Sequence, residues 1–156
     1  MDFVRPVRML SNTHTIETGN GKMYATISHL NNKPLEVFIH LGKSGQLLNT
    51  FSEALGRIIS IALQGDIPVS NISKTLIDIN SDKSTWYRFE ESDKRPTQIL
   101  SIPDGIAKLL DRYYSENGSL YSNEEGDGER CPNCGKKLIA IEGCHNCASC
   151  GYSKCS

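Results

Sequence analysis

Six cysteines lie between residues 131 and 155, and no cysteine precedes them. Two segments share one form, in which two residues separate a pair of cysteines and a glycine follows: Cys131-Pro132-Asn133-Cys134-Gly135 and Cys147-Ala148-Ser149-Cys150-Gly151. The two-residue spacing lets both thiolates of a pair bind one ion, and the glycine lets the chain turn so that its amides face the sulfurs. Two such turns supply the ligands of a closed tetrahedral zinc site. We therefore predict one Zn2+ per chain, bound by Cys131, Cys134, Cys147 and Cys150.

Two cysteines remain outside these turns. A pairing of Cys144 with Cys147 lacks the glycine after its second cysteine, so Cys144 and Cys155 are the candidate redox thiols. Lys154 favours the thiolate of its neighbour Cys155, and the thiolate is the form that exchanges with disulfides. The residues leave a second interpretation open, in which both cysteines are spare or alternative zinc ligands. Disulfides in place of zinc would require an oxidising compartment, for which the N-terminal residues give no evidence.

Two basic glycine turns form a second candidate site. Residues 42–45, Gly-Lys-Ser-Gly, lie between a predicted strand and a predicted helix, where backbone amides and the helix dipole favour an anion. Residues 19–22, Gly-Asn-Gly-Lys, form a similar turn. The candidate nucleotide- or phosphate-binding residues are Gly21, Lys22, Lys43, Ser44, Gly45 and Arg57. No complete phosphate-loop motif is present, so ordinary turn chemistry is the competing interpretation.

The composition is that of a globular protein, with 156 residues, 38% hydrophobic and 22% charged. A formal net charge of -1 at pH 7 argues against a protein built for phosphate backbones. A nucleic-acid-binding zinc ribbon is a further alternative because of Lys136, Lys137, His145 and Lys154, but four thiolates on one zinc carry negative charge. No apolar run approaches the roughly 18 residues of a membrane helix. The N-terminus also lacks a signal-peptide pattern, so we expect a cytoplasmic protein.

Strand patterns that would position these sites come first along the chain. In residues 35–41, Leu35, Val37, Ile39 and Leu41 fall on one face of a strand. Residues 22–29 are predicted to pair with this strand as an antiparallel hairpin, and residues 13–18 to form an edge strand. The sequence therefore predicts a small antiparallel sheet with one face against a core.

Helical patterns follow the strands. Apolar residues recur at helical spacing over 47–63 and indicate a buried stripe: Leu47, Leu48, Phe51, Leu55, Ile58, Ile59 and Ala62. Thr50 with Glu53, or Ser44, is the predicted cap. The stripe also suits an isologous homodimer, which composition does not distinguish from burial within one chain. Further helices are predicted over 70–78 and from Pro103 to Tyr114, with a polar loop over 79–98.

The composition changes abruptly after Tyr114, where acidic residues, glycine and serine replace the apolar ones. We therefore predict an α+β domain over 1–114, in which a small antiparallel sheet packs with helices, and a flexible acidic linker over 115–130. A zinc ribbon with its cysteine tail follows over 131–156, and residues 138–141 are expected to form its short strand.

An ordered set of motifs runs through most of the chain. The motifs are residues 18–24 (TGNGKMY), 36–45 (EVFIHLGKSG), 53–60 (EALGRIIS), 101–108 (SIPDGIAK) and a tail with 142–144 (EGC) and 150–155 (CGYSKC). Together they resemble the C-terminal region of adenosylcobalamin-dependent (class II) ribonucleotide reductases. The first domain is similar to the TSCPD domain, named for a Thr-Ser-Cys-Pro-Asp string. Here that string reads Leu100-Ser101-Ile102-Pro103-Asp104, so no thiol chemistry can reside at its cysteine position.

The resemblance implies an accessory function in ribonucleotide reduction. The family's catalytic barrel, with its thiyl-radical cysteine and cobalamin site, would need several hundred further residues, so we expect no reductase activity from this chain by itself. Adenosylcobalamin would act only in a partner catalytic chain. Electrons from a thioredoxin-like reductant would pass through Cys144 and Cys155 to that partner. The alternative is a freestanding nucleotide-binding or nucleotide-sequestering protein.

Overall fold

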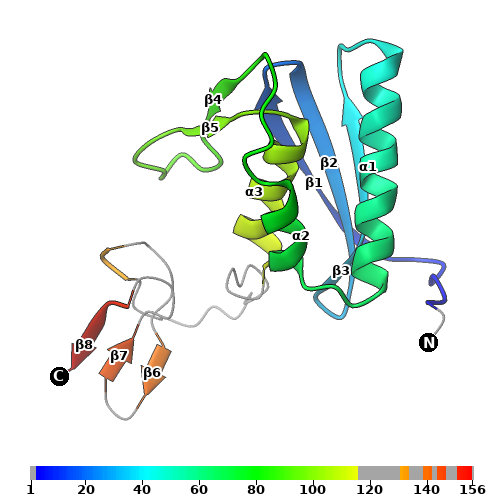
Figure 1. Cartoon of the computed structure of the whole chain (residues 1–156). Coiled ribbons are helices and arrows are strands. Elements are labelled where there is room, and N and C mark those ends of the chain that lie inside the picture. Colours follow the sequence, from blue (N-terminus) through cyan, green and yellow to red (C-terminus); the bar gives the residue numbers. More distant parts are fainter. Residues whose placement is uncertain (1–2, 116–130, 134–138, 142–143, 147–150, 156) are drawn as a thin grey trace. The chain divides into compact units, whose positions relative to one another are not determined.

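A computed structural model describes residues 3–115, 131–133, 139–141, 144–146 and 151–155. The chain divides into two compact units, Met1–Ser115 and Glu116–Ser156. The first unit has the order β1-β2-β3-α1-α2-β4-β5-α3, and β6, β7 and β8 belong to the second (Figure 1). Each unit is described by itself below.

An antiparallel sheet of order β1-β2-β3 forms the base of the first unit. Its strands are β1 (Leu10–Thr18), β2 (Gly21–Leu30) and β3 (Lys33–Leu41). Asn31 and Asn32 both have positive φ and form the tight turn between β2 and β3, as two-residue hairpins favour. Alternation places Met23, Ala25 and Ile27 on the buried face of β2. The predicted sheet is confirmed, and its strands extend slightly beyond the predicted ranges.

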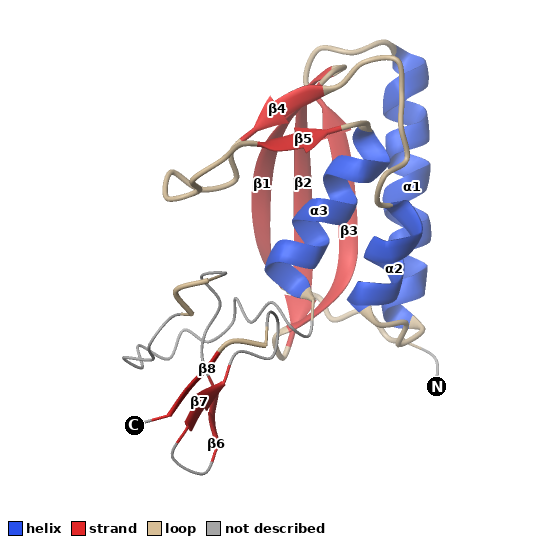
Figure 2. Cartoon of the chain, turned by 60° about the vertical axis from the view of Figure 1, so that its left-hand side comes forward, coloured by secondary structure: helices blue, strands red, loops and turns tan. Residues whose placement is uncertain are grey.

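The helix α1 (Gln46–Gln64) runs along β3, at the edge of the sheet (Figure 2). Its side chains satisfy backbone groups on the outer edge of this strand. Asn49 Oδ1 accepts the N–H of Leu41 at 2.9 Å, and Ser60 Oγ accepts that of Val37 at 2.8 Å. A Cβ atom at Gly56 would lie 2.7 Å from the carbonyl oxygen of Val37, so glycine permits the close approach of helix and strand. The long helix is confirmed, and α1 covers an edge that would otherwise invite pairing with another strand.

Two expectations about α1 were wrong. The helix begins at Gln46, and no side chain within the described residues caps its first turn, because Ser44 Oγ accepts a hydrogen bond from Asn49 Nδ2 instead. The predicted stripe is not buried as a whole, since α1 contacts the sheet through Ser52, Gly56, Ile59 and Leu63. The sheet is narrower than the apolar face of the helix. Leu47, Phe51 and Ile58 are therefore exposed.

The remaining helices are α2 (Val69–Leu76) and α3 (Ile102–Tyr114), which lie in front of the sheet (Figure 2). Both predicted helices are confirmed. The expected loop over 79–98 instead contains β4 (Thr85–Tyr87), which pairs with β5 (Thr97–Ile99) as a short antiparallel hairpin. Tyr87 Oη donates to the carbonyl of Thr15 at 2.6 Å and fixes this hairpin to β1. Segments this short carry too little alternation for a sequence pattern to detect.

The second unit contains β6 (Ile139–Ile141), β7 (Cys144–Asn146) and β8 (Ser153–Cys155), paired antiparallel in that order. The strand β6 falls within the predicted strand 138–141. Residues 116–130 of the predicted linker lie outside the described residues. Within the part of the chain that the structure describes, no helix is both long and apolar enough to cross a membrane.

Candidate functional site

The two predicted redox cysteines lie on neighbouring strands of the second unit. Cys144 of β7 is directly opposite Cys155 of β8, and His145 is opposite Lys154. Directly opposite residues of antiparallel strands have Cα atoms about 4.5–5.5 Å apart. This separation lies within the range of roughly 4.4–6.8 Å that a disulfide spans. Cys144 takes part in a disulfide. The register therefore brings together two positions that are eleven residues apart in the sequence.

Of the four predicted zinc ligands, Cys131 lies within the described residues, and Cys134, Cys147 and Cys150 lie outside them. Cys131 is only 2% exposed and packs against Tyr152. Gly151 has φ +73°, the left-handed conformation that a glycine turn after a cysteine pair uses. The described residues contain no group of three or more side chains suited to a metal ion. The zinc site therefore stays a prediction.

The two basic glycine turns come together at one end of the sheet. Gly42 donates its N–H to the carbonyl of Lys22 at 2.9 Å, which places residues 42–45 beside the turn between β1 and β2. Thr18 Oγ1 shapes that turn by donating to the carbonyl of Gly21 at 2.7 Å. Gly21 itself has φ +106°, a conformation that favours glycine. Five of the six candidate phosphate-binding residues are thus neighbours along these two turns.

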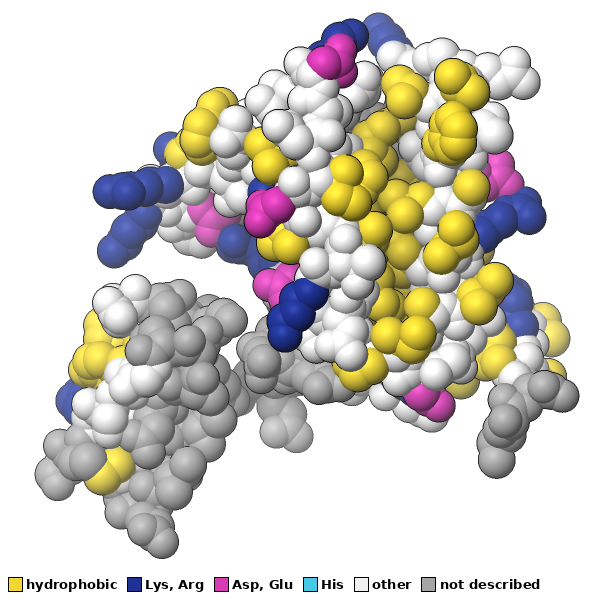
Figure 3. Space-filling view, viewed as in Figure 1, with side chains coloured by type: hydrophobic (Ala, Val, Ile, Leu, Met, Phe, Trp, Pro, Cys, Tyr) yellow, Lys and Arg dark blue, Asp and Glu magenta, His cyan; other side chains and the backbone are white. Residues whose placement is uncertain are grey.

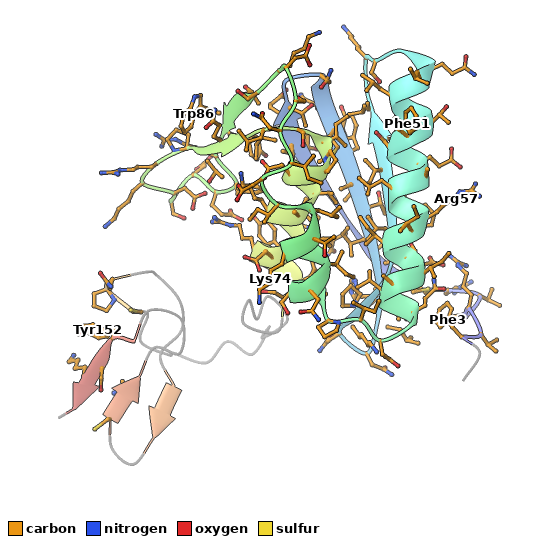
Figure 4. All side chains as sticks on the ribbon, viewed as in Figure 1. Phe3, Phe51, Arg57, Lys74, Trp86 and Tyr152 are labelled. Atoms are coloured by element: carbon orange, nitrogen blue, oxygen red, sulfur yellow. The ribbon has the colours of Figure 1, made fainter. Side chains whose placement is uncertain are left out.

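Arg57 does not join this group. It lies twelve residues after Gly45, which is about 18 Å along the helix at the α-helical rise. Its guanidinium pairs with Glu53 at 2.5 Å, and Figure 4 shows it extending from the outer side of α1, away from the sheet. Lys22 is partly neutralised by Glu17, at 3.5 Å. The positive charge of the two turns is therefore modest.

A fully buried carboxylate joins three segments at the start of α3. Asp104 Oδ1 accepts the backbone N–H of Asp78 at 2.9 Å, just after α2. Its Oδ2 accepts the N–H of Leu100 at 2.8 Å and an N–H of Lys108 Nζ at 2.7 Å. Lys108 also donates to the carbonyl of Gln98 in β5, at 2.8 Å. This pair was not singled out in the sequence analysis, although an Asp and a Lys four residues apart on a predicted helix indicate an ion pair.

An aromatic cluster joins β1, the β4–β5 loop and α3. His14 Nε2 lies 2.7 Å from Tyr114 Oη, and the His14 ring stacks on Tyr113 at a centroid distance of 5.0 Å. Tyr113 Oη donates to Glu90. Burial lowers the pKa of His14, partly opposed by the negative charge of Glu90. Burial, followed by the hydrogen bond to Glu90, raises the pKa of Tyr113. Burial therefore favours the neutral form of His14, which packs and hydrogen-bonds within this cluster.

Comparison with protein-family models matches residues 2–114 to the TSCPD domain. The chain belongs to the TSCPD domain family. TSCPD domains are found in class II ribonucleotide reductases, so the match associates the chain with ribonucleotide reductase. No curated protein and no solved structure matches the chain significantly.

The string that names the TSCPD domain builds the start of α3 in this chain. Ser101 is the N-cap, and its Oγ accepts the N–H of Asp104 at 3.2 Å while donating to the carbonyl of Ile79 at 2.6 Å. Pro103 occupies the first turn, where its missing N–H costs nothing. Ile102 stands at the cysteine position and is buried. Asp104 completes the string as the buried carboxylate. The string is therefore a structural element of this TSCPD domain.

Proposed function

We propose that this chain is a redox-accessory module of a class II ribonucleotide reductase system. In this proposal the second unit binds one structural zinc ion and carries electrons by thiol–disulfide exchange at Cys144 and Cys155. The observation that carries the proposal is their directly opposite position in the β7–β8 ladder. A cysteine pair at this separation can close and reopen a disulfide without backbone rearrangement.

The exchange would proceed in two balanced steps. One thiolate of the reduced pair attacks a disulfide of the catalytic partner, which forms a mixed disulfide and releases a thiolate. The other cysteine of the pair then attacks the sulfur of the first cysteine in that mixed disulfide and releases the second thiolate of the catalytic partner. The catalytic partner gains two electrons and ends as a dithiol, while Cys144 and Cys155 end as a disulfide. A thioredoxin-like dithiol reduces this disulfide by the same two steps and is itself oxidised.

Zinc would hold the strands that carry the pair. Cys131 and Cys134 precede β6, whereas Cys147 and Cys150 lie between β7 and β8. Cys131 is buried against Tyr152, two residues beyond Cys150, and this contact supports a common site for the two cysteine turns. When bound, a tetrahedral zinc ion cross-links such turns and supplies folding energy to a small domain.

Thioredoxin-coupled NADPH oxidation tests the proposal directly. The full chain, loaded with zinc and oxidised, is mixed with thioredoxin, thioredoxin reductase and NADPH, and the absorbance of NADPH is followed. We expect one NADPH to be consumed per chain, and Cys155→Ser to abolish this consumption while retaining zinc. Ser153→Ala, in the same strand, is the matched control and should behave as the unmodified chain. Undiminished consumption by Cys155→Ser would remove the shuttle role.

A second candidate function is nucleotide binding by the TSCPD domain. The hydrogen bond from the N–H of Gly42 to the carbonyl of Lys22 supports nucleotide binding. It brings Lys22, Lys43 and the start of α1 together at one end of the sheet. Calorimetric titration with ATP and dATP tests this candidate. Lys43→Ala should weaken binding, whereas Arg57→Ala should leave it unchanged. Absence of heat of binding with either nucleotide would exclude these two ligands.

A further inference from the structure

One side of α1 exposes a row of large apolar side chains. Leu47, Phe51, Ile58 and Ile61 are 70%, 65%, 66% and 71% exposed. They are spaced by four, seven and three residues, so they lie on one face of the helix, with the exposed Ala54 at its centre. Figure 3 shows apolar side chains gathered along α1 and toward α2. We name these five residues the α1 stripe.

The α1 stripe is close in size to the largest apolar patches found on monomers, and such patches are often functional. From typical side-chain areas, its four large residues expose roughly 500 Å2 per copy, near the upper end for the largest patch of a monomer. The stripe residues do not take part in packing on the sheet, because α1 contacts β3 through its buried residues Ser52, Gly56, Ile59 and Leu63. The stripe therefore indicates a contact outside the single TSCPD domain.

We propose that the α1 stripe is the interface of a homodimer, in which two α1 helices pack antiparallel about a twofold axis near Ala54. Leu47 and Ile61 lie seven residues to either side of Ala54, and Phe51 and Ile58 lie three and four residues to either side. The axis thus places each large side chain of one copy against a large side chain of the other. Ala54 meets its own equivalent, and its small side chain lets the two helices approach closely. The stripe is self-complementary, which an isologous interface requires.

Charges beside the stripe fit the same arrangement. Glu53 and Arg57 lie together on one flank of α1, where they form an ion pair within the helix. In an antiparallel pair about Ala54, Glu53 of one copy lies two residues along the helix axis from the position of Arg57 of the partner subunit, and the twofold axis repeats this contact. This flank therefore carries two contacts between opposite charges and one like-charge contact, between the two Glu53 residues beside the axis. An unrelated partner would not require the self-complementary spacing of the stripe, and this symmetry identifies a second copy of the chain as the partner.

The area of the stripe is sufficient for a specific dimer. Two copies together would bury about 1,000 Å2 from the four large residues of each, before the flanking residues are counted. This reaches the lower end of specific protein–protein interfaces, above most crystal-packing contacts. Such an interface predicts a reversible dimer, whose dissociation depends on protein concentration.

Sedimentation velocity of the full chain under reducing conditions, over a concentration series up to about 100 µM, tests the proposal. The unmodified chain should approach the mass of a dimer. Ile58→Glu buries a charge in each copy and should raise the dissociation constant more than about 100-fold. Phe38→Glu, an exposed apolar residue on the opposite face of the sheet, is the matched control and should remain dimeric. Circular dichroism verifies that both variants are folded.

A charge-reversal pair adds a second test at two exposed positions. Arg57→Glu should weaken the dimer, and the double variant Glu53→Arg with Arg57→Glu should restore it, because the two cross-subunit contacts are re-formed with reversed signs. A monomer at every concentration, a dimer that survives Ile58→Glu, or one that Phe38→Glu dissociates would overturn the proposal.

Discussion

Replacing the buried carboxylate of Asp104 should strongly destabilise the TSCPD domain. In Asp104→Ala, the backbone N–H groups of Asp78 and Leu100 lose their acceptor, and the ammonium of Lys108 loses its counter-ion. These groups connect the end of α2, the end of β5 and the first turns of α3. The substitution therefore loosens the packing of three elements while leaving the apolar core unchanged.

The magnitude follows from burial. Asp104 is 0% exposed, and the side chain of Lys108 is 19% exposed, so the lysine can recover part of its hydration when the carboxylate is removed. Breaking a buried ion pair from one side costs about 3–5 kcal/mol, and the partial hydration of Lys108 favours the lower end. We expect the free energy of unfolding to fall by about 3 kcal/mol, which corresponds to roughly 10 °C in the melting temperature.

Urea and thermal unfolding followed by circular dichroism at 222 nm measure this change. The helices in the described residues belong to the first unit, so the signal reports on the TSCPD domain. Asp111→Ala is the matched control, because Asp111 is an exposed carboxylate on the same helix and its removal should cost within about 0.5 kcal/mol. If Asp104→Ala cost no more than Asp111→Ala, the structural role assigned to the family string would be refuted.

Two further predictions concern packing inside the first unit. Because burial lowers the folded-state pKa of His14 below its unfolded value of about 6.5, stability should be present above that value and be lost as the pH falls through the folded-state pKa. Melting temperatures between about pH 7.5 and pH 5 should fall less steeply in His14→Gln, and an unchanged slope would contradict the assignment. Gly56→Ala should destabilise by about 1 kcal/mol or more, since overpacking against the carbonyl of Val37 outweighs a gain in helix propensity of about 1 kcal/mol. Gly45→Ala, which meets no atom within 4 Å, is its control in the same urea titration, and equal effects of the two substitutions would argue against close packing at Gly56.

The distribution of cysteines assigns the two units different tasks. The TSCPD domain contains no cysteine, and its name-giving string carries Ile102 where the family string has a thiol. Any thiol exchange by this chain must therefore occur in the second unit. In the functions proposed above, the first unit would bind a second copy or a nucleotide. Ile102 is buried at the cysteine position, and its neighbours Ser101 and Asp104 make the hydrogen bonds that hold the start of α3.

The sequence by itself determined the sheet, the three helices and the family of the first unit. Alternation in residues 35–41 and the three- and four-residue spacing after Gly45 are local signals, because strand and helix periods act on neighbouring residues. The motifs in the TSCPD region predicted the family, which the match over residues 2–114 confirms. The cysteine spacing likewise predicts zinc, since ligand geometry depends on a few consecutive residues.

Only the tertiary structure decided which residues meet across the chain. It put Cys144 opposite Cys155, gave Asp104 partners from three segments and left Arg57 away from the glycine turns. It also decided that part of the apolar face of α1 stays exposed, because helical periodicity shows that such a face exists but not how much of it the sheet covers. Contacts of this kind depend on strand register, on the direction of a helix and on the width of its neighbours. These quantities are set by packing between elements distant in sequence, and no local pattern encodes them.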